Sequence, residues 1–422
     1  MEFIEEPLNF IGLAPAASSI IKVIGVGGGG SNAVNHMYEE GIHDVTFVVC
    51  NTDNQALANS PVSVKLQLGR KTTEGLGAGA RPEKAQEAAK ESYQEIENLL
   101  NDNTKMAFVT AGMGGGTGTG AAPVVAQIAK EMGILTVGIV TIPFAFEGKR
   151  KILQALDGVE EISKHVDALL VVNNERLKDI YPDLTLKNAF KKADDTLTIA
   201  AKSIAEIITL EGYVNCDFAD VSTIMKDGGV AIMSAGFGEG EHRITKALED
   251  ALQSPLLNNN NVFDAKKVLL YLSSSDNEEY MVRMEEMTEI HEFMYKFGKD
   301  VEVIWGAAFD NKLQKEVKVT ILATGFDISA IPDIKIKEQE AAKEKDEENV
   351  KREEKENERI EKAYGRDKTK AILRHGKKAE IITLDQEQME NNNLIDLLDT
   401  YAPYNRDSTI KSKIKAQMKF IL

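Results

Sequence analysis

The feature that most constrains this chain is a glycine-rich run, Gly112 to Gly120, which holds six glycines and two threonines in nine residues. It lies between an apolar stretch typical of a buried strand, Met106 to Ala111, and an apolar stretch with helical spacing, Ala121 to Met132. A strand that turns through glycines into a helix directs several backbone N–H groups, and the positive end of the helix dipole, at one point. The run therefore predicts a phosphate-binding loop.

The run is not a loop of the Walker type. That loop needs a lysine just before its hydroxyl residue, and no lysine or arginine lies between Gly112 and Gly120. An earlier loop, with Gly25, Gly27 and Gly30, satisfies the GxGxxG pattern of dinucleotide-binding folds. Asp53, after the next strand, stands where such folds place an acid against ribose. A nicotinamide-dependent oxidoreductase is therefore an alternative at this point.

Strands and helices alternate through the first half of the chain. Strands are predicted at Ser19–Val26, Val45–Cys50, Val62–Leu68, Met106–Ala111, Ile134–Ile142 and Val166–Val172. Helices are predicted up to Glu40, and at Arg81–Leu100, Ala121–Met132, Lys149–Lys164 and Leu184–Leu210. This alternation predicts a mostly parallel sheet with helices on both faces, and ligands in such sheets bind at the carboxyl ends of the strands. Three glycine-rich loops at that edge, the third at Gly75–Ala80, favour a triphosphate over a single pyrophosphate.

The long helix is followed by a second αβ region with strands near Val230, Val268, Val301 and Val317. From Lys337 to Lys368 the chain is highly charged and has almost no large apolar residues, so it cannot pack a core. A short apolar cluster and a basic end then favour a peptide that binds a partner or an anionic surface. The predicted organisation is an N-terminal extension (1–18), a nucleotide-binding domain (19–185), a central helix (186–211), a second α/β domain (212–328), a disordered charged linker (329–392) and a tail peptide (393–422).

Composition argues against several classes of protein. The formal charge of −17 argues against a non-specific nucleic-acid binder, because no excess of basic side chains is available to replace counterions. Cys50 and Cys216 are too few for a disulfide framework or a zinc site, which fits a reducing cytoplasm. The acidic stretch Met1 to Pro7 does not resemble a signal peptide, and no run approaches the roughly 18 apolar residues of a membrane span. We expect a cytoplasmic protein that reaches membranes only through a partner.

Six motifs resemble, in order and spacing, those of the FtsZ branch of the tubulin/FtsZ family. They are Gly27–Asn32, Asn51–Asp53, Gly77–Ala80, Gly114–Gly120, Pro143–Gly148 and Asn215–Asp220, and the resemblance covers roughly Ile20 to Phe326. It implies a Rossmann-like GTP-binding domain joined by the central helix to a second α/β domain. It also implies a GTPase that polymerises head to tail into filaments of the bacterial division ring, at midcell.

The resemblance implies which residues bind GTP or GDP. The glycine loops would hold the nucleotide, chiefly its phosphates, through Gly27, Gly28, Gly29, Asn32, Gly77, Ala78, Gly79, Gly114, Gly115, Gly116, Thr117, Gly118 and Thr119. Pro143 and Glu147 belong to the next motif, whose acid contacts the ribose. Guanine would be read by Asn174, Phe190 and Asp194. A carboxylate suits guanine because it accepts from N1–H and N2–H₂, whereas adenine presents an acceptor at N1.

Asn215, Asp217 and Asp220 match the loop that, in this family, enters the nucleotide site of the next subunit and completes the hydrolytic centre. An incoming carboxylate can orient the attacking water, while Mg²⁺, held mainly by phosphates and water and not by side chains, offsets the γ-phosphate charge. The same Asp-x-x-Asp pattern also suits the N-cap and first turn of a helix toward Met225. Both roles are compatible.

Two departures from the family pattern leave questions open. Where arginine is usual, this chain has Lys151 with Arg150 beside it, so the sequence does not decide which side chain meets the phosphates. The stretch from Leu394 to Tyr404 matches the family's C-terminal peptide poorly, which weakens the expectation that division-site adaptors bind there. A non-enzymatic filament protein of tubulin type, which binds nucleotide but turns it over little, is a further alternative, against which Asp217 and Asp220 argue.

Overall fold

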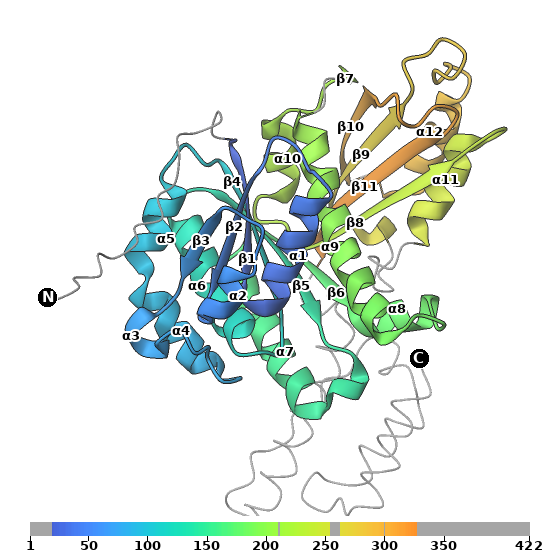
Figure 1. Ribbon diagram of the computed structural model, residues 1–422. Coiled ribbons are helices and arrows are strands. Elements are labelled where there is room, and N and C mark those ends of the chain that lie inside the picture. The colour runs from blue at the N-terminus through green and yellow to red at the C-terminus, as the bar shows by residue number, and fades with distance from the viewer. Residues whose placement is uncertain (1–18, 210–211, 254–261, 299, 327–422) are drawn as a thin grey trace, which may run out of the picture. The chain divides into compact units, whose positions relative to one another are not determined.

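The structure is a computed structural model that describes residues 19–209, 212–253, 262–298 and 300–326 (Figure 1). The predicted N-terminal extension, linker and tail lie outside these residues. The strands are β1 (Ile21–Val26), β2 (Thr46–Asn51), β3 (Val64–Gln67), β4 (Met106–Gly112), β5 (Leu135–Ile142), β6 (Ala168–Asn173), β7 (Gly212–Val214), β8 (Gly229–Gly238), β9 (Lys267–Ser274), β10 (Glu302–Phe309) and β11 (Val317–Phe326). The α-helices are α1 (Gly27–Glu39), α2 (Asn54–Ala58), α3 (Arg70–Thr73), α4 (Pro82–Glu91), α5 (Tyr93–Leu100), α6 (Thr117–Glu131), α7 (Lys149–Ser163), α8 (Asn174–Ile180), α9 (Leu186–Thr209), α10 (Phe218–Met225), α11 (Arg243–Leu252) and α12 (Met287–Met294). Short 3₁₀ turns, η1 (Ala145–Glu147) and η3 (Val262–Asp264), complete the described elements.

The described strands form one sheet in the order β3-β2-β1-β4-β5-β6-β8-β11-β9-β10-β7. The strands from β3 to β8 in this order are all parallel, as are β9 and β10, whereas β11 is antiparallel to both of its neighbours. The predicted α/β fold with a mostly parallel sheet is therefore confirmed. The second region continues the sheet of the first, because β6 pairs with β8 at Ala168↔Gly229 and Leu169↔Val230. The division into domains at residues 185, 211 and 328 stays a prediction.

Helices cover both faces of this sheet. Successive residues of a strand point to opposite faces, and in β4 Met106 and Phe108 join one apolar cluster while Ala107 and Val109 join the other. One cluster packs α4, α5, α6, α7, α11 and α12 against the sheet, and the other packs α1, α2, α9 and α10. Burial on both faces explains why the strands read as continuous apolar runs.

The structure corrects two helix boundaries. The helix expected from Ala121 begins at Thr117, inside the glycine run, so that the run itself supplies the helix N-terminus. The single helix expected from Arg81 to Leu100 is two helices, α4 and α5, because the backbone leaves helical geometry at Ser92. The Ser92 hydroxyl accepts a hydrogen bond from the Gly69 N–H at 3.0 Å, a contact between residues 23 apart that local sequence does not reveal.

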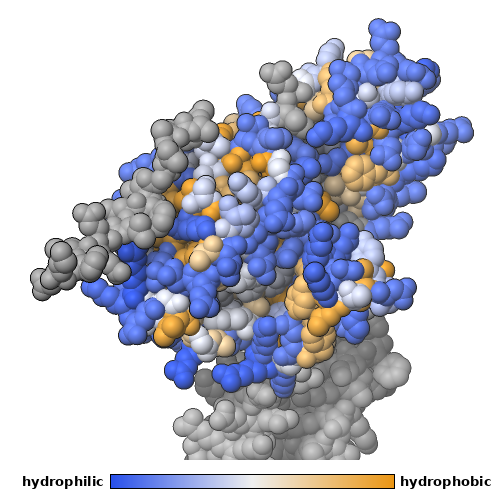
Figure 2. Space-filling view, viewed as in Figure 1, coloured by the Kyte–Doolittle hydropathy of each residue, from blue (hydrophilic) through white to orange (hydrophobic). Residues whose placement is uncertain are grey.

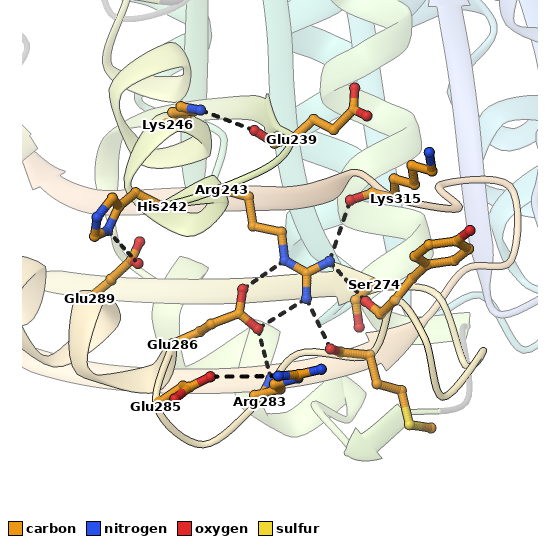
Figure 3. Close-up of polar contacts among 12 residues, drawn as sticks. Glu239, His242, Arg243, Lys246, Ser274, Arg283, Glu285, Glu286, Glu289 and Lys315 are labelled. Carbon is orange, nitrogen blue, oxygen red and sulfur yellow. Dashed lines mark hydrogen bonds and ion pairs between the residues drawn. The ribbon is translucent and has the colours of Figure 1, made fainter.

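A buried arginine organises the region around α11 (Figure 3). The Arg243 guanidinium donates through Nε to Glu286 at 2.7 Å and through a second nitrogen to the other carboxylate oxygen at 3.0 Å. It also donates to the backbone carbonyls of Tyr280, Met281 and Lys315. One side chain thus joins α11, the loop before α12 and the turn before β11. Hydrogen bonding to Arg243 lowers the pKa of Glu286, so the pair is ionised at neutral pH.

Hydrophilic residues dominate the face shown in Figure 2, with hydrophobic residues in small patches between them. Within the described part of the chain, no helix combines the length and the apolar character needed to cross a membrane.

Candidate functional site

Two helix N-termini meet at the carboxyl edge of the sheet. The helix α1 follows β1 directly at Gly27, and α6 follows the neighbouring strand β4 at Thr117. A Cβ on Gly27, whose φ is +73°, would lie 2.7 Å from the backbone nitrogen of Gly118, so the two termini touch and only glycine fits. The first N–H groups of a helix have no partner within it, and its dipole is positive at this end. Two such ends at one place favour a negative charge there, which is the property that the glycine run predicts.

The glycines of these loops divide by the space around them. A Cβ on Gly25 would lie 2.4 Å from the carbonyl oxygen of Gly30, and one on Gly30 would lie 2.3 Å from that of Thr110, so both allow close packing of α1 on the sheet. A Cβ on Gly28 or Gly115 would meet nothing within 4 Å. Gly25 and Gly30 therefore serve packing, whereas Gly28 and Gly115 present bare backbone to an open space.

That open space is a cavity of about 390 Å³, of the size of a small-molecule site. Thirteen of the residues predicted from the sequence line it: Gly28, Gly29, Asn32, Gly115, Gly116, Thr117, Gly118, Pro143, Glu147, Lys151, Asn174, Phe190 and Asp194. Five further residues line it: Gly112 and Met113, which belong to the predicted glycine run but were not named as site residues, and Thr141, Ala193 and Leu197, which were not predicted. Positional signals exist for some of these, because Thr141 lies near the carboxyl end of β5 and Ala193 and Leu197 flank Asp194 on α9.

Several other predicted residues do not line the cavity and instead support its wall. The Thr119 hydroxyl accepts the Gly114 N–H at 2.9 Å. Ala78 packs beneath Gly116, where an added Cβ would lie 3.1 Å from the Ala78 Cβ. The loop of Gly77 and Gly79 is tied in through Thr52, whose carbonyl accepts the Gly77 N–H at 3.1 Å and whose hydroxyl bonds the Thr117 hydroxyl at 2.7 Å. Gly27, Gly77, Ala78, Gly79, Gly114 and Thr119 thus shape the loops without facing the cavity.

The far end of the cavity holds polar groups without partners. The Asn174 side chain is buried, and its oxygen has no hydrogen-bond partner in the described part of the chain. Burial raises the pKa of Asp194 to about 7, and no hydrogen bond or ion pair of its carboxylate is found among the described residues. Phe190 is 41% exposed and lies edge-on to Phe144, with ring centroids 5.2 Å apart. These groups suit a flat ligand edge that donates hydrogen bonds.

Arg150 and Lys151 point to different places. Lys151 lines the cavity, and its ammonium pairs with the Glu147 carboxylate. The other oxygen of Glu147 accepts the Phe144 N–H at 2.9 Å, so both carboxylate oxygens are engaged. Arg150 lines a separate groove of about 660 Å³ between α4, α6 and α7. The geometry therefore places Lys151, and not Arg150, beside the cavity.

The acidic loop after β7 lies away from this cavity. Asp217 caps α10, because its carboxylate accepts the N–H groups of Ala219 at 2.8 Å and Asp220 at 3.1 Å. Asp220 accepts the Asp217 N–H at 3.0 Å in return, and Asn215 accepts the Gly212 N–H at 2.6 Å. None of the residues Asn215, Asp217 and Asp220 lines the cavity. The strand β7 is seven positions from β4 in the sheet, or roughly 30 Å across the strands, and α10 lies near the end of α9 opposite α8 (Figure 1).

The structure removes the support for a dinucleotide site. Asp53 is the N-cap of α2, and its carboxylate accepts the N–H groups of Gln55 at 2.9 Å and Ala56 at 3.2 Å. It is therefore engaged in capping and does not line the cavity. Among the described residues, no group of three or more His, Cys, Asp and Glu side chains is arranged to hold a metal ion.

Known proteins match the chain over most of its length. Residues 20–182 match the tubulin/FtsZ family GTPase domain, and residues 229–327 match the FtsZ family C-terminal domain. A cell division protein FtsZ of Porphyromonas gingivalis is 50% identical, over 97% of this chain and 90% of its own length. A cell division protein FtsZ of Aquifex aeolicus is 46% identical, over 72% of this chain and 83% of its own length.

Among solved structures, an "FtsZ dimer, empty" of M. jannaschii aligns with a TM-score of 0.66 and 40% identity, over 72% of this chain and 88% of that one. The Porphyromonas gingivalis alignment extends past the region from Ile20 to Phe326 on which the sequence motifs lie. The two matched domains and the relatives at 46–50% identity all indicate the same family. The chain therefore belongs to the FtsZ family of tubulin-like GTPases.

Proposed function

We propose that this chain binds GTP in the cavity between α1, α6 and α9 and hydrolyses it with acids supplied by a second copy of the chain. Family membership carries the coarser statement: the protein is a cell-division GTPase that binds GTP or GDP and forms polymers. The observation that supports the finer one is the cavity itself. It has two helix N-termini at one end, and at the other it has Asp194 and the Asn174 oxygen, which has no hydrogen-bond partner among the described residues.

The anionic end of the nucleotide fits the glycine loops. The backbone at Gly28, Gly115 and Gly116 lines the cavity, and the helix dipoles of α1 and α6 both favour negative charge there. Lys151 adds a positive charge at the same wall once a phosphate competes with Glu147 for it. The phosphates would thus be held mainly by backbone amides. This explains why the loops are rich in glycine.

The base end fits guanine. Guanine offers two adjacent donors, N1–H and N2–H₂, and a partly buried carboxylate can accept from both. The Asp194 carboxylate meets this description, with Phe190 beside it to cover the ring face and Asn174 to add a polar contact. Adenine would leave the carboxylate facing the N1 lone pair, so the site discriminates against ATP.

A Mg²⁺ ion fits this arrangement only through the nucleotide. Mg²⁺ sites on nucleotides use phosphate oxygens, waters and at most one or two carboxylates, and the Glu147 carboxylate is already occupied by Lys151 and the Phe144 N–H. Phosphates and water would therefore hold the ion, which supplies charge neutralisation for phosphoryl transfer.

Among the described residues that line the cavity, no carboxylate is placed to orient the attacking water at the phosphate end. The two acids that line it are Glu147, which is paired, and Asp194, which lies at the base end. Asp217 is exposed at the surface of the chain, and Asp220 is half-buried beside it. A head-to-tail contact that carries this loop into the next subunit's cavity repeats without closing, and so forms a filament. The M. jannaschii relative is described as a dimer.

The remaining assignments follow from the family and from the sequence. The polymer would assemble in the cytoplasm at the midcell division site, with membrane contact only through adaptors and no role for nucleic acid. Adaptors would bind the tail, residues 393–422, which lies outside the described part of the chain.

The shared site is tested with variants that keep the helix cap. Asparagine caps helices as well as aspartate does, so Asp217→Asn and Asp220→Asn should keep fold and GTP affinity while hydrolysis falls by 100-fold or more, on the order expected for loss of a water-orienting group. Activity per chain of the wild type should also vanish at concentrations below assembly. Normal turnover in both variants would refute the role of this loop.

A further inference from the structure

A glutamine behind the glycine run fixes the direction of its peptide groups. Gln154 lies on α7, one turn beyond Lys151, on the side of the helix that faces the run. Its side-chain nitrogen donates to the carbonyl oxygen of Gly115 at 2.8 Å and to that of Gly114 at 3.2 Å. Two consecutive carbonyls are therefore turned toward the same side chain.

This arrangement determines where the neighbouring amides point. In a trans peptide unit the C=O and the following N–H point in opposite directions. With the carbonyls of Gly114 and Gly115 directed at Gln154, the N–H groups of Gly115 and Gly116 point away from it. Both residues line the cavity, and neither N–H has a protein partner within the described ranges.

Consecutive N–H groups that point the same way form an anion-binding concavity. The backbone reaches this geometry because Gly114 has φ +94°, a conformation that other residues rarely adopt. Within the described ranges, one other side chain bonds this part of the run: the Thr119 hydroxyl accepts the Gly114 N–H, one peptide unit earlier. Among the described side chains, Gln154 alone holds the two peptide units whose amides face the cavity.

We propose that Gln154 is a positioning residue of the GTPase site, which aims the amides of Gly115 and Gly116 at the nucleotide phosphates. This inference rests on the proposed assignment of the cavity to GTP. Gln154 acts through the backbone and does not touch the nucleotide. Without it, glycine peptide units are free to rotate, and a rotated unit presents a carbonyl oxygen to the phosphate in place of a donor.

The surroundings of Gln154 allow this role to be tested separately from any role in stabilising the fold. The side chain is half-buried and also borders the 660 Å³ groove between α4, α6 and α7. An apolar side chain of the same length, as in Gln154→Met, fits there without leaving a cavity in the core. Gln86 on α4 borders the same groove and makes no hydrogen bond to the run, so Gln86→Met is a matched control.

The experiment compares ligands with and without phosphates. Calorimetric titrations of wild type, Gln154→Met and Gln86→Met use guanosine, GDP and GTP. For Gln154→Met we expect GDP and GTP affinities to fall about 10- to 100-fold, as for loss of one charge-assisted hydrogen bond or more. Guanosine affinity and the thermal midpoint should remain those of the wild type, and Gln86→Met should match the wild type throughout.

A general structural role of Gln154 would weaken guanosine and GTP alike, and that result would overturn the proposal. An unchanged GTP affinity in Gln154→Met would overturn it as well. Failure of the underlying GTP assignment is seen separately, in the wild type, as GDP and GTP binding no tighter than guanosine.

Discussion

The replacement Asp194→Asn should have opposite effects on the empty protein and on nucleotide binding. Burial raises the pKa of Asp194 from its ordinary 3.8 to about 7, while His36 lowers it and Asp195 raises it further. A carboxyl group with a raised folded-state pKa destabilises the folded protein when it ionises. The cost is absent below pH 3.8, grows between pH 3.8 and 7, and is complete above pH 7. At 1.36 kcal/mol for each pKa unit, the full cost is at most about 4 kcal/mol.

An asparagine at this position carries no charge, so it avoids this cost. In the absence of nucleotide, urea unfolding should show the variant more stable than the wild type at pH 8. The advantage should shrink by about 2–3 kcal/mol at pH 5, where the wild-type carboxyl is protonated in the folded state. Asp195→Asn is the matched control. It relieves some repulsion on the ionised Asp194 but also removes the contact of Asp195 with His36 at 2.6 Å, so any gain at pH 8 should be smaller than that of Asp194→Asn.

Nucleotide binding should change in the other direction. The amide of an asparagine offers guanine one acceptor and an unwanted donor. GTP affinity should therefore fall about 100-fold, and the ratio of GTP affinity to ATP affinity should decrease. Wild-type affinity for GTP should also decline as pH falls below 7, because the protonated carboxyl accepts less well. Equal stability of variant and wild type at pH 8, together with unchanged GTP affinity, would refute both the burial argument and the guanine assignment.

Three further outcomes are expected. Lys151→Met should weaken GTP binding about 10-fold or more, and Arg150→Met should leave it unchanged, because only Lys151 lines the cavity; equal effects in calorimetry would contradict this. Arg243→Met should lower the free energy of unfolding by about 3–5 kcal/mol by leaving Glu286 without its partner, with GTP affinity preserved in the folded variant; a loss under 1 kcal/mol in urea unfolding would be inconsistent with the network. Deleting residues 337–422 should preserve GTPase activity and polymer formation in pelleting assays while division fails in cells, and loss of hydrolysis in vitro would show that the tail is part of the enzyme.

Local pattern was sufficient for the features that depend on neighbours in the chain. The two strand–glycine–helix junctions and the apolar stripe of α9 were predicted from spacing, although both helices begin inside the glycine runs, at Gly27 and Thr117. The Asp217–Asp220 pattern allowed a cap, and the structure contains it. The three-residue strand β7 was missed because so short a segment has no periodicity, and its existence depends on pairing with β10 about 90 residues later.

Other features depend on contacts that no local pattern encodes. Lys151 and Arg150 are adjacent, and about 100° of helix rotation decides which of them faces the cavity. The helix break at Ser92 is accompanied by a hydrogen bond from Gly69. Arg243 bonds backbone carbonyls up to 72 residues away, and Gln154 bonds a loop up to 40 residues earlier in the chain. Each is a polar group whose partner is fixed by the tertiary fold.

The central claim, a hydrolytic site shared between two copies, is tested most directly by mixing two inactive chains. Asp220→Asn binds GTP but lacks the acid, whereas Gly115→Leu keeps the acid but fills the cavity, since its side chain enters space that is open within 4 Å. Each chain alone should hydrolyse little GTP. In an equal mixture that co-assembles at random, about a quarter of the interfaces join an intact cavity to an intact acidic loop, and a corresponding fraction of wild-type activity should return. Co-sedimentation of both chains without any recovery of hydrolysis would contradict the shared site.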